Sequence, residues 1–90
     1  MTSGGHVQVT LKLYASLADH LPPEARRNHR LPLALPVGTT IAEVIGQQNL
    51  PPKLCHLVLV NGFYIPPAER ATRALSDEDE LAIWPPIAGG

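Results

Sequence analysis

The residues of this sequence with the clearest chemical potential are Gly89 and Gly90, the pair with which it ends. Glycine fits a space too narrow for a Cβ atom, and we expect the α-carboxylate of Gly90 to be unobstructed. Pro85 and Pro86 hold the backbone extended just before this pair and lower the entropy cost of ordering it. The pattern predicts a tail, residues 85–90, that threads into a partner's narrow channel and presents the carboxylate.

A terminal glycine pair alone is weak support for this prediction. Such a pair arises by chance in about 0.5% of chains, and Gly4-Gly5 occurs in the same sequence. The context therefore has to decide between function and accident. In the functional interpretation, Ile87 and Ala88 lie in the channel together with the flanking prolines and glycines.

Other reactive side chains form no catalytic or metal-binding pattern. Cys55 is the only cysteine, and no acid–base pattern lies near it, so we expect a structural role. Arg26, Arg27 and Arg30 lack interleaved aromatic residues, which favours a solvated loop over contacts with phosphate. No glycine-rich phosphate loop is present, so any nucleotide is expected on a partner. The histidines without metal-ligand spacing are His6, His20, His29 and His56.

Size and composition indicate one small domain. Ninety residues with 44% apolar side chains can bury a core, although only 4% are aromatic. A net charge of −1 implies neither nucleic acid nor an anionic membrane surface as a partner. No apolar run approaches the roughly 20 residues of a membrane span, and residues 1–6 lack a signal-peptide pattern. The single cysteine fits a reducing compartment, so we expect a cytoplasmic protein.

The tail needs a sheet to hold it, and five segments have strand patterns. Residues 7–13 alternate apolar and polar side chains, as in a strand with one buried face. Residues 57–60 form an apolar run typical of a buried strand. Asn61-Gly62 predicts a tight hairpin that returns through residues 63–65. The remaining strands are residues 31–35, placed at an edge by their prolines, and residues 81–84.

One main helix is expected between the second and third strands. Thr40 and Glu43 have the spacing of a capping box, which predicts the helix start. We expect the helix to end near Asn49. Gly46 lies inside it and costs about 1 kcal/mol relative to alanine, so a tight packing contact is expected there.

These elements predict an α+β domain with the β-grasp, or ubiquitin-like, arrangement. It has a mixed four- to five-stranded sheet and one main helix packed across one face. Residues 14–21 are expected to form short helical turns, and residues 24–30 a solvated loop. We expect residues 1–6 to be a flexible lead-in, residues 7–84 the domain, and residues 85–90 the extended tail.

Three stretches of the sequence resemble the MoaD/ThiS sulfur-carrier family. They are the hairpin Leu-Val-Leu-Val-Asn-Gly at 57–62, the turn Leu-Ser-Asp-Glu-Asp-Glu-Leu at 75–81, and the close Ala-Ile-Trp-Pro-Pro-Ile-Ala-Gly-Gly at 82–90. The last six residues are most similar to those of the small subunit of molybdopterin synthase, since thiamine-pathway carriers usually lack the Pro-Pro pair. The sequence departs from the family in a longer segment at 22–30 and a short main helix.

The resemblance implies a carrier rather than a catalyst. An E1-like enzyme would use ATP to adenylate Gly90, and sulfur from a persulfide donor would displace AMP to leave a thiocarboxylate. The sulfur would pass to a pterin precursor on the molybdopterin synthase large subunit. The chain itself would bind no cofactor or metal and would supply no catalytic group. The resulting expectation is a sulfur carrier for molybdenum or tungsten cofactor synthesis.

A partner-docking face is expected beside the tail. If Leu81 and Ile83 are buried, alternation points Trp84 outward beside Leu59, and Phe63 of the hairpin adds to this apolar surface. Trp84 covering the edge of the core is the alternative. Likewise, the acidic residues 77–80 are either a solvated turn or a device that steers a basic partner.

Other functions remain open for the same tail. A ubiquitin-like modifier would join Gly90 to lysines of other proteins, and a sulfur carrier could serve another pathway such as thiamine synthesis. A non-covalent β-grasp interaction module would not use the tail at all. A residue added after Gly90 would leave that module active but would abolish either covalent function.

Overall fold

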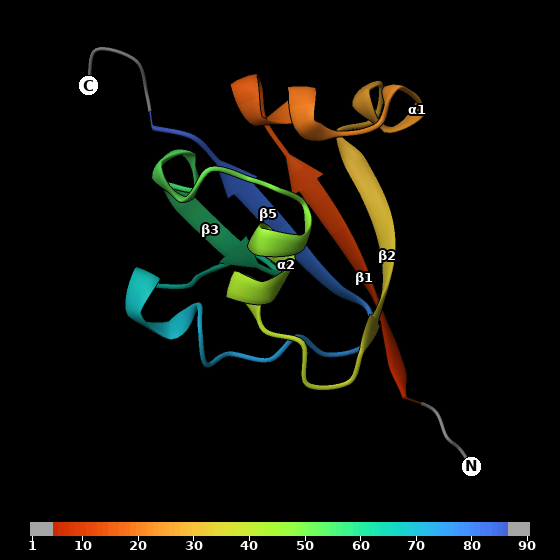
Figure 1. Cartoon of the computed structure of the whole chain (residues 1–90), viewed down its shortest axis with the longest axis vertical. Helices are drawn as coiled ribbons and strands as arrows, with labels where there is room; N and C mark the ends of the chain where they lie inside the picture. The colour runs from red at the N-terminus through yellow and green to blue at the C-terminus, as the bar shows by residue number, and fades with distance from the viewer. Residues whose placement is uncertain (1–4, 87–90) are drawn as a thin grey trace.

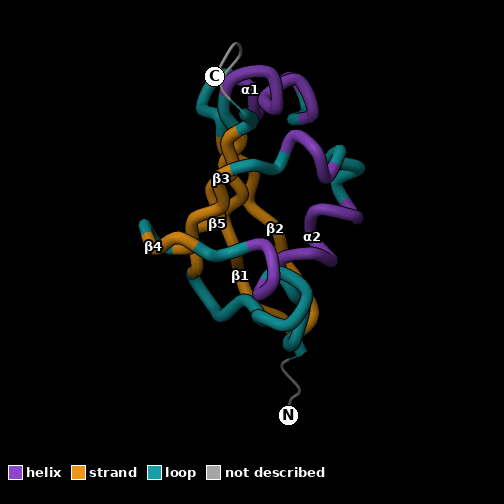
Figure 2. Tube along the Cα trace, turned by 90° about the vertical axis from the view of Figure 1, so that its left-hand side faces the viewer, coloured by secondary structure: helices purple, strands orange, loops and turns teal. Residues whose placement is uncertain are grey.

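A mixed five-stranded sheet forms the centre of the computed structural model, which describes residues 5–86 (Figure 1). In spatial order the strands are β2, β1, β5, β3 and β4. Helix α2 lies against one side of the sheet, while α1 lies at one end of it (Figure 2). The strand bounds are His6–Leu13 for β1, Arg30–Pro36 for β2, Leu57–Val60 for β3, Phe63–Tyr64 for β4 and Asp79–Trp84 for β5.

The two central strands, β1 and β5, run parallel, and Leu11 lies opposite Leu81. Both of these leucines are fully buried, which confirms the alternation expected from the sequence. Strand β1 begins at His6, one residue before the expected start, because His6 pairs with Pro36 of the edge strand. The last strand lies beside the first, as a β-grasp sheet requires.

Helix α2, Ile41–Gln47, begins with the predicted capping box. The Glu43 amide donates to Thr40 Oγ1 at 3.2 Å, and the Thr40 amide donates to Glu43 Oε1 at 2.8 Å. The helix ends two residues before the expected Asn49, which has a positive φ of 57°. Its buried face consists of Ile41, Val44 and Ile45.

The expectation of tight packing at Gly46 is wrong. A Cβ atom added to this residue would meet no atom within 4 Å. Gly46 also has no positive φ that would require glycine. Neither packing nor backbone geometry therefore explains why the helix accepts its lower propensity at this position.

The expected loop over residues 24–30 is partly helical. Helix α1, Pro23–Arg26, follows the 3₁₀ helix η1, Ala15–His20. Proline suits the first turn because its fixed φ is already helical and its missing N–H would have no partner there. Ala25 is buried under the sheet end, and Arg26 donates to the carbonyl of Leu21 at 3.0 Å. The burial of Ala25 therefore holds this segment in place. The charged residues around Ala25 hide that apolar position in the sequence.

The hairpin between β3 and β4 has the predicted turn. Asn61 and Gly62 have positive φ values of 52° and 86°, as tight hairpins require. The Asn61 side chain also donates to Asp79 Oδ1 at 2.8 Å, which ties the turn to β5. Two further 3₁₀ helices, η2 at Pro52–Leu54 and η3 at Pro67–Glu69, each begin at the second residue of a proline pair. No helix within residues 5–86 is long and apolar enough to cross a membrane.

Candidate functional site at the end of β5

The expected tail begins where the central strand β5 ends. The carbonyl of Ile83 accepts a hydrogen bond from the Tyr14 amide at 3.2 Å, and that of Trp84 accepts one from the His56 amide at 3.0 Å. Both flanking strands thus hold the last two residues of β5. Beyond them, Pro85 is partly buried and Pro86 is exposed.

The remaining tail residues named from the sequence lie outside the described part of the chain. They are Ile87, Ala88, Gly89 and Gly90. The channel-threading role of residues 85–90 and the reactivity of the last carboxylate therefore stay predictions. The structure defines the base from which that tail starts.

An aromatic ladder packs at this base. The rings of Tyr14 and Trp84 stack with centroids 4.2 Å apart and planes within 3°. The His29 ring continues the row on the other side of Tyr14, at 5.9 Å and 9°. Trp84 is partly buried, so it contributes to packing and to the surface at once. Sequence reasoning missed Tyr14 and His29, because only the strand pairing brings these distant residues together.

The uncovered face of the sheet has an apolar patch next to the ladder. Trp84 pairs with Leu57, and Leu59 pairs with Ala82, so the side chains of Trp84 and Leu59 leave the same face. Tyr64, which pairs with Leu59, adds a side chain that is 54% exposed. We call the following residues the apolar patch: Tyr14, Leu57, Leu59, Tyr64 and Trp84.

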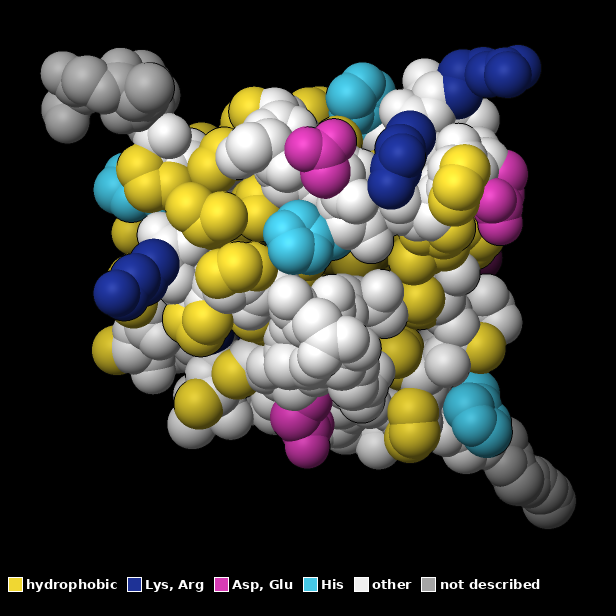
Figure 3. Space-filling model, turned by 45° about the horizontal axis from the view of Figure 1, so that its top comes forward, with side chains coloured by type: hydrophobic (Ala, Val, Ile, Leu, Met, Phe, Trp, Pro, Cys, Tyr) yellow, Lys and Arg dark blue, Asp and Glu magenta, His cyan; other side chains and the backbone are white. Residues whose placement is uncertain are grey.

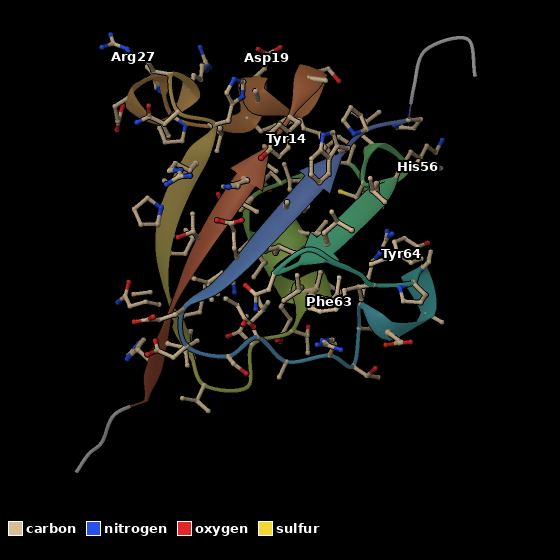
Figure 4. The ribbon with its side chains drawn as sticks, turned by 180° about the vertical axis from the view of Figure 1, so that it is seen from behind. Tyr14, Asp19, Arg27, His56, Phe63 and Tyr64 are labelled. Atoms are coloured by element: carbon tan, nitrogen blue, oxygen red, sulfur yellow. The ribbon has the colours of Figure 1, made fainter. Side chains whose placement is uncertain are left out.

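Phe63 does not join Trp84 and Leu59. It pairs with Val60, whose side chain is buried on the helix side, so Phe63 leaves β4 on the opposite face from Tyr64. Its side chain is 73% exposed at the hairpin. Figure 4 shows Phe63 and Tyr64 on the hairpin, whereas Tyr14 and His56 lie at the end of the sheet from which the tail starts. Sequence alternation could have identified Tyr64 in place of Phe63.

Charged groups border this region without forming a catalytic cluster. Figure 3, which views the molecule from its helix side and top, shows hydrophobic side chains gathered near the start of the tail, with histidine and basic side chains beside them. Burial raises the pKa of the Cys55 thiol, an effect that the nearby Arg70 charge partly offsets. The thiol is therefore neutral at ordinary pH. Within residues 5–86, no group of three or more His, Cys, Asp or Glu side chains is placed to hold a metal ion.

The acidic residues 77–80 lie at the other end of β5, and most are occupied within the chain. Asp77 Oδ1 accepts a hydrogen bond from the backbone N–H of Gln8 at 2.7 Å, and Asp79 Oδ2 accepts one from the backbone N–H of Ser76 at 2.8 Å. Glu80 pairs with Lys12 at 3.1 Å. These contacts favour a structural role for the turn, since three of its four carboxylates have partners within the chain.

Comparison with known proteins gives the family. A model described as the ThiS family matches residues 24–90, which include β2 to β5 and the final glycines. The chain belongs to the ThiS family. The match confirms the resemblance inferred from the hairpin, the acidic turn and the closing residues. No curated protein matches the chain.

Solved structures similar to this ThiS-family chain have the same ubiquitin-like fold. The HVO 2177 protein of Haloferax volcanii has a TM-score of 0.72 at 20% identity, with 100% of this chain and 92% of that one covered. SAMP1 of the same organism has a TM-score of 0.63 at 23% identity, covering 92% and 99%. Small archaeal modifier protein 1 of Methanosarcina acetivorans has a TM-score of 0.62 at 25% identity, covering 97% and 100%. The predicted β-grasp fold is confirmed.

Proposed function

We propose that this ThiS-family chain is a sulfur carrier for molybdopterin synthesis, with Gly90 as the residue that bears the sulfur. The observation that carries the proposal is the family match, which runs through Gly90. The closing sequence Pro-Pro-Ile-Ala-Gly-Gly adds the molybdopterin assignment, because it is most similar to the small subunit of molybdopterin synthase.

The geometry at the end of β5 supports a carrier. Hydrogen bonds from Tyr14 and His56 hold the carbonyls of Ile83 and Trp84, and stacking on Tyr14 holds the Trp84 ring. A tail that starts from such a rigid base, and continues through two prolines, loses less entropy when a partner orders it. That saving favours insertion of a slim backbone into another protein's active site.

The proposed chemistry needs reactants from partners. A Gly90 carboxylate oxygen attacks the α-phosphorus of ATP on an E1-like enzyme, and pyrophosphate leaves. The terminal sulfur of a persulfide then attacks the acyl carbon, and AMP leaves with the bonding electron pair. A thiol finally reduces the resulting acyl disulfide, which frees the thiocarboxylate while the donor thiol becomes a disulfide. The chain contributes the carboxylate and no acid, base, metal or bound cofactor.

Docking would use the apolar patch. Leu57 and Tyr64 are 37% and 54% exposed, and Trp84 lies beside them at the base of the tail. Aromatic side chains at the centre of an interface often account for most of the binding energy. Both the activating enzyme and the molybdopterin synthase large subunit have to receive the same tail, so we expect both to contact this patch.

The test is an intact-mass measurement. The chain is incubated with an E1-like enzyme, ATP, magnesium and a persulfide-generating system, and a product with one oxygen replaced by sulfur is expected. The matched control has one alanine added after Gly90 and should fold equally well yet stay unmodified. Addition of the large subunit and pterin precursor should then return the carboxylate. The enzyme is first shown to be active on a carrier protein that it is known to modify. If this chain then stays unmodified under the same conditions, the proposal is refuted.

A second function, protein modification through Gly90, is favoured by the similarity to small archaeal modifier protein 1. The two functions leave different products. Because Arg73 is the last basic residue of the sequence, trypsin would leave residues 74–90 attached to a target lysine. Such branched peptides, found without a thiocarboxylate, would support the modifier. A thiocarboxylate that serves a thiamine-pathway acceptor but no pterin precursor would support a different sulfur pathway.

A further inference from the structure

A pocket of about 360 Å³ lies on the helix side of the molecule, away from the apolar patch. It is bounded by α2, by the segment that leads from α2 to η2 and β3 (Figure 1), and by the side chain of Arg70, which follows η3. Its volume is near the lower limit of about 300 to 1,000 Å³ that is typical of small-molecule sites. The lining residues that matter below are Ala42, Ile45, Gly46, Leu50, Cys55 and Arg70.

Gly46 keeps this pocket open. A Cβ atom on Gly46 would meet nothing within 4 Å, and the residue lines the pocket. Glycine inside a helix is less favourable than alanine, and no packing contact or positive φ compensates for that cost here. The absence of a side chain at Gly46 therefore leaves open space beside α2.

Arg70 supplies a hydrogen-bond donor without an acceptor. Its two terminal nitrogens donate to the carbonyls of Cys55 at 2.7 Å and His56 at 3.1 Å. Its own carbonyl accepts from the Ala42 amide at 2.8 Å. Side chain and backbone are thus both fixed, while the buried Nε has no partner among the described residues. The guanidinium is thus held in one orientation at the pocket wall, where its positive charge favours an anionic ligand.

The chemistry of the walls selects the ligand. Ala42, Ile45 and Leu50 present hydrocarbon, whereas Arg70 is the one charged residue among residues 5–86 that lines the pocket. The Cys55 thiol in the same wall is neutral because burial raises its pKa, so it does not repel an anion. A carboxylate is the strong, charge-assisted acceptor that matches a guanidinium N–H.

We propose that this pocket binds a small aliphatic carboxylic acid. Its hydrocarbon chain packs against α2 and Leu50, in the space that Gly46 leaves, and its carboxylate pairs with the guanidinium of Arg70. The site is independent of the proposed sulfur-carrier function, because it lies on the helix side and uses none of residues 84–90.

Hexanoate is a suitable probe, with 1-hexanol as its uncharged counterpart. Titration of the isotope-labelled chain with hexanoate should give saturable shifts of amide signals, centred on residues 42–55 and Arg70. Hexanol should bind at least about tenfold more weakly, because it lacks the negative charge that pairs with the guanidinium.

The decisive variant fills the pocket without weakening the fold. Gly46→Leu introduces a better helix former into open space, so the melting temperature should stay the same or rise. Hexanoate binding should be lost. Gly46→Ala is the matched control, because it makes the same gain in helix propensity but adds only one methyl group and should retain binding.

Arg70→Lys tests the head group. Lysine keeps the positive charge but lacks the planar guanidinium that the carbonyls of Cys55 and His56 hold in place, so the affinity for hexanoate should fall about tenfold while that for hexanol stays unchanged. Three results would each overturn the proposal: no saturable shift with hexanoate, equal affinity for hexanol in the wild-type chain, or unchanged hexanoate binding in Gly46→Leu. The last two do not depend on whether Arg70→Lys folds.

Discussion

The two ends of strand β5 differ in how they use their side chains. At its start, carboxylates of residues 77–80 accept hydrogen bonds from Gln8 and Ser76 or pair with Lys12. At its end, Trp84 stacks on Tyr14 and remains partly exposed, and two prolines follow. The acidic end is conspicuous in the sequence but is occupied internally. The aromatic end leaves surface for another protein.

This contrast shows that charge density is a poor guide to function in a small domain. A carboxylate that accepts backbone hydrogen bonds is fixed in place and stabilises a turn. A partly exposed aromatic ring gains from further burial, so it contributes to an interface even while it packs within its own chain. We therefore expect mutations at the acidic end to change stability, and those at the aromatic end to change partner recognition.

The largest effect is expected for Trp84→Ala on reaction with the activating enzyme. Loss of a central aromatic contact should raise the KM for the chain on the order of 10- to 100-fold. Asp77→Asn, at the opposite end of β5, should change that KM by less than about twofold. Steady-state adenylation assays with both variants test the contrast. Equal effects of the two substitutions would mean that the acidic turn also contacts the enzyme.

The next effect concerns the acidic turn itself. Asp79→Ala removes the acceptor for the Ser76 amide and for the Asn61 side chain, so the free energy of unfolding should fall by about 2 kcal/mol. Asp79→Asn keeps one side-chain oxygen and should lose less. Chemical denaturation measures both values. The structural role would be contradicted if the adenylation rate of a variant fell by more than the fraction of that variant that is unfolded.

A smaller effect is expected within the aromatic ladder. A double-mutant cycle of Tyr14→Ala and Trp84→Ala should give a coupling free energy of about 0.5–1.5 kcal/mol for unfolding. The only tryptophan of the chain is Trp84, so its fluorescence should also change when Tyr14 is replaced. Additive effects of the two substitutions would show that the stacked rings do not stabilise each other.

The smallest effect is expected for the ion pair between Lys12 and Glu80. Their side chains are 18% and 45% exposed, so solvent screens the attraction, and the coupling should be below about 1 kcal/mol. It should shrink further when the salt concentration is raised. Denaturation of Lys12→Met, Glu80→Gln and the double variant at low and high salt measures this. A coupling insensitive to salt would indicate a better-shielded pair.

Much of the fold could be predicted from local patterns. The strand over residues 7–13, the capping box at Thr40 and the hairpin turn at Asn61-Gly62 each depend on neighbours in sequence, and each is confirmed. Helix α1 could not be predicted in the same way. It depends on burial of Ala25 against the sheet, which the charged residues around it conceal.

The features of the candidate site likewise divide into those that local sequence predicts and those that depend on strand pairing. Family membership follows from linear motifs that end at Gly90, so the sequence alone was sufficient. The ladder of His29, Tyr14 and Trp84 was not predictable, because strand pairing brings together residues far apart in the chain. The sequence indicated Phe63 as part of the docking face, but the hairpin register places its side chain on the other face and presents Tyr64 beside Leu59 instead.

By itself, the sequence determined the strands, the helix cap, the hairpin and the family, since these depend on side-chain periodicity and on residue types at fixed spacing. Tertiary structure alone decided which groups meet across the sheet and which space stays open. Gly46 shows the difference: the sequence indicated a tight contact, whereas folding left a pocket beside it, bordered by Arg70. Packing depends on what lies opposite a residue, and no local pattern contains that information.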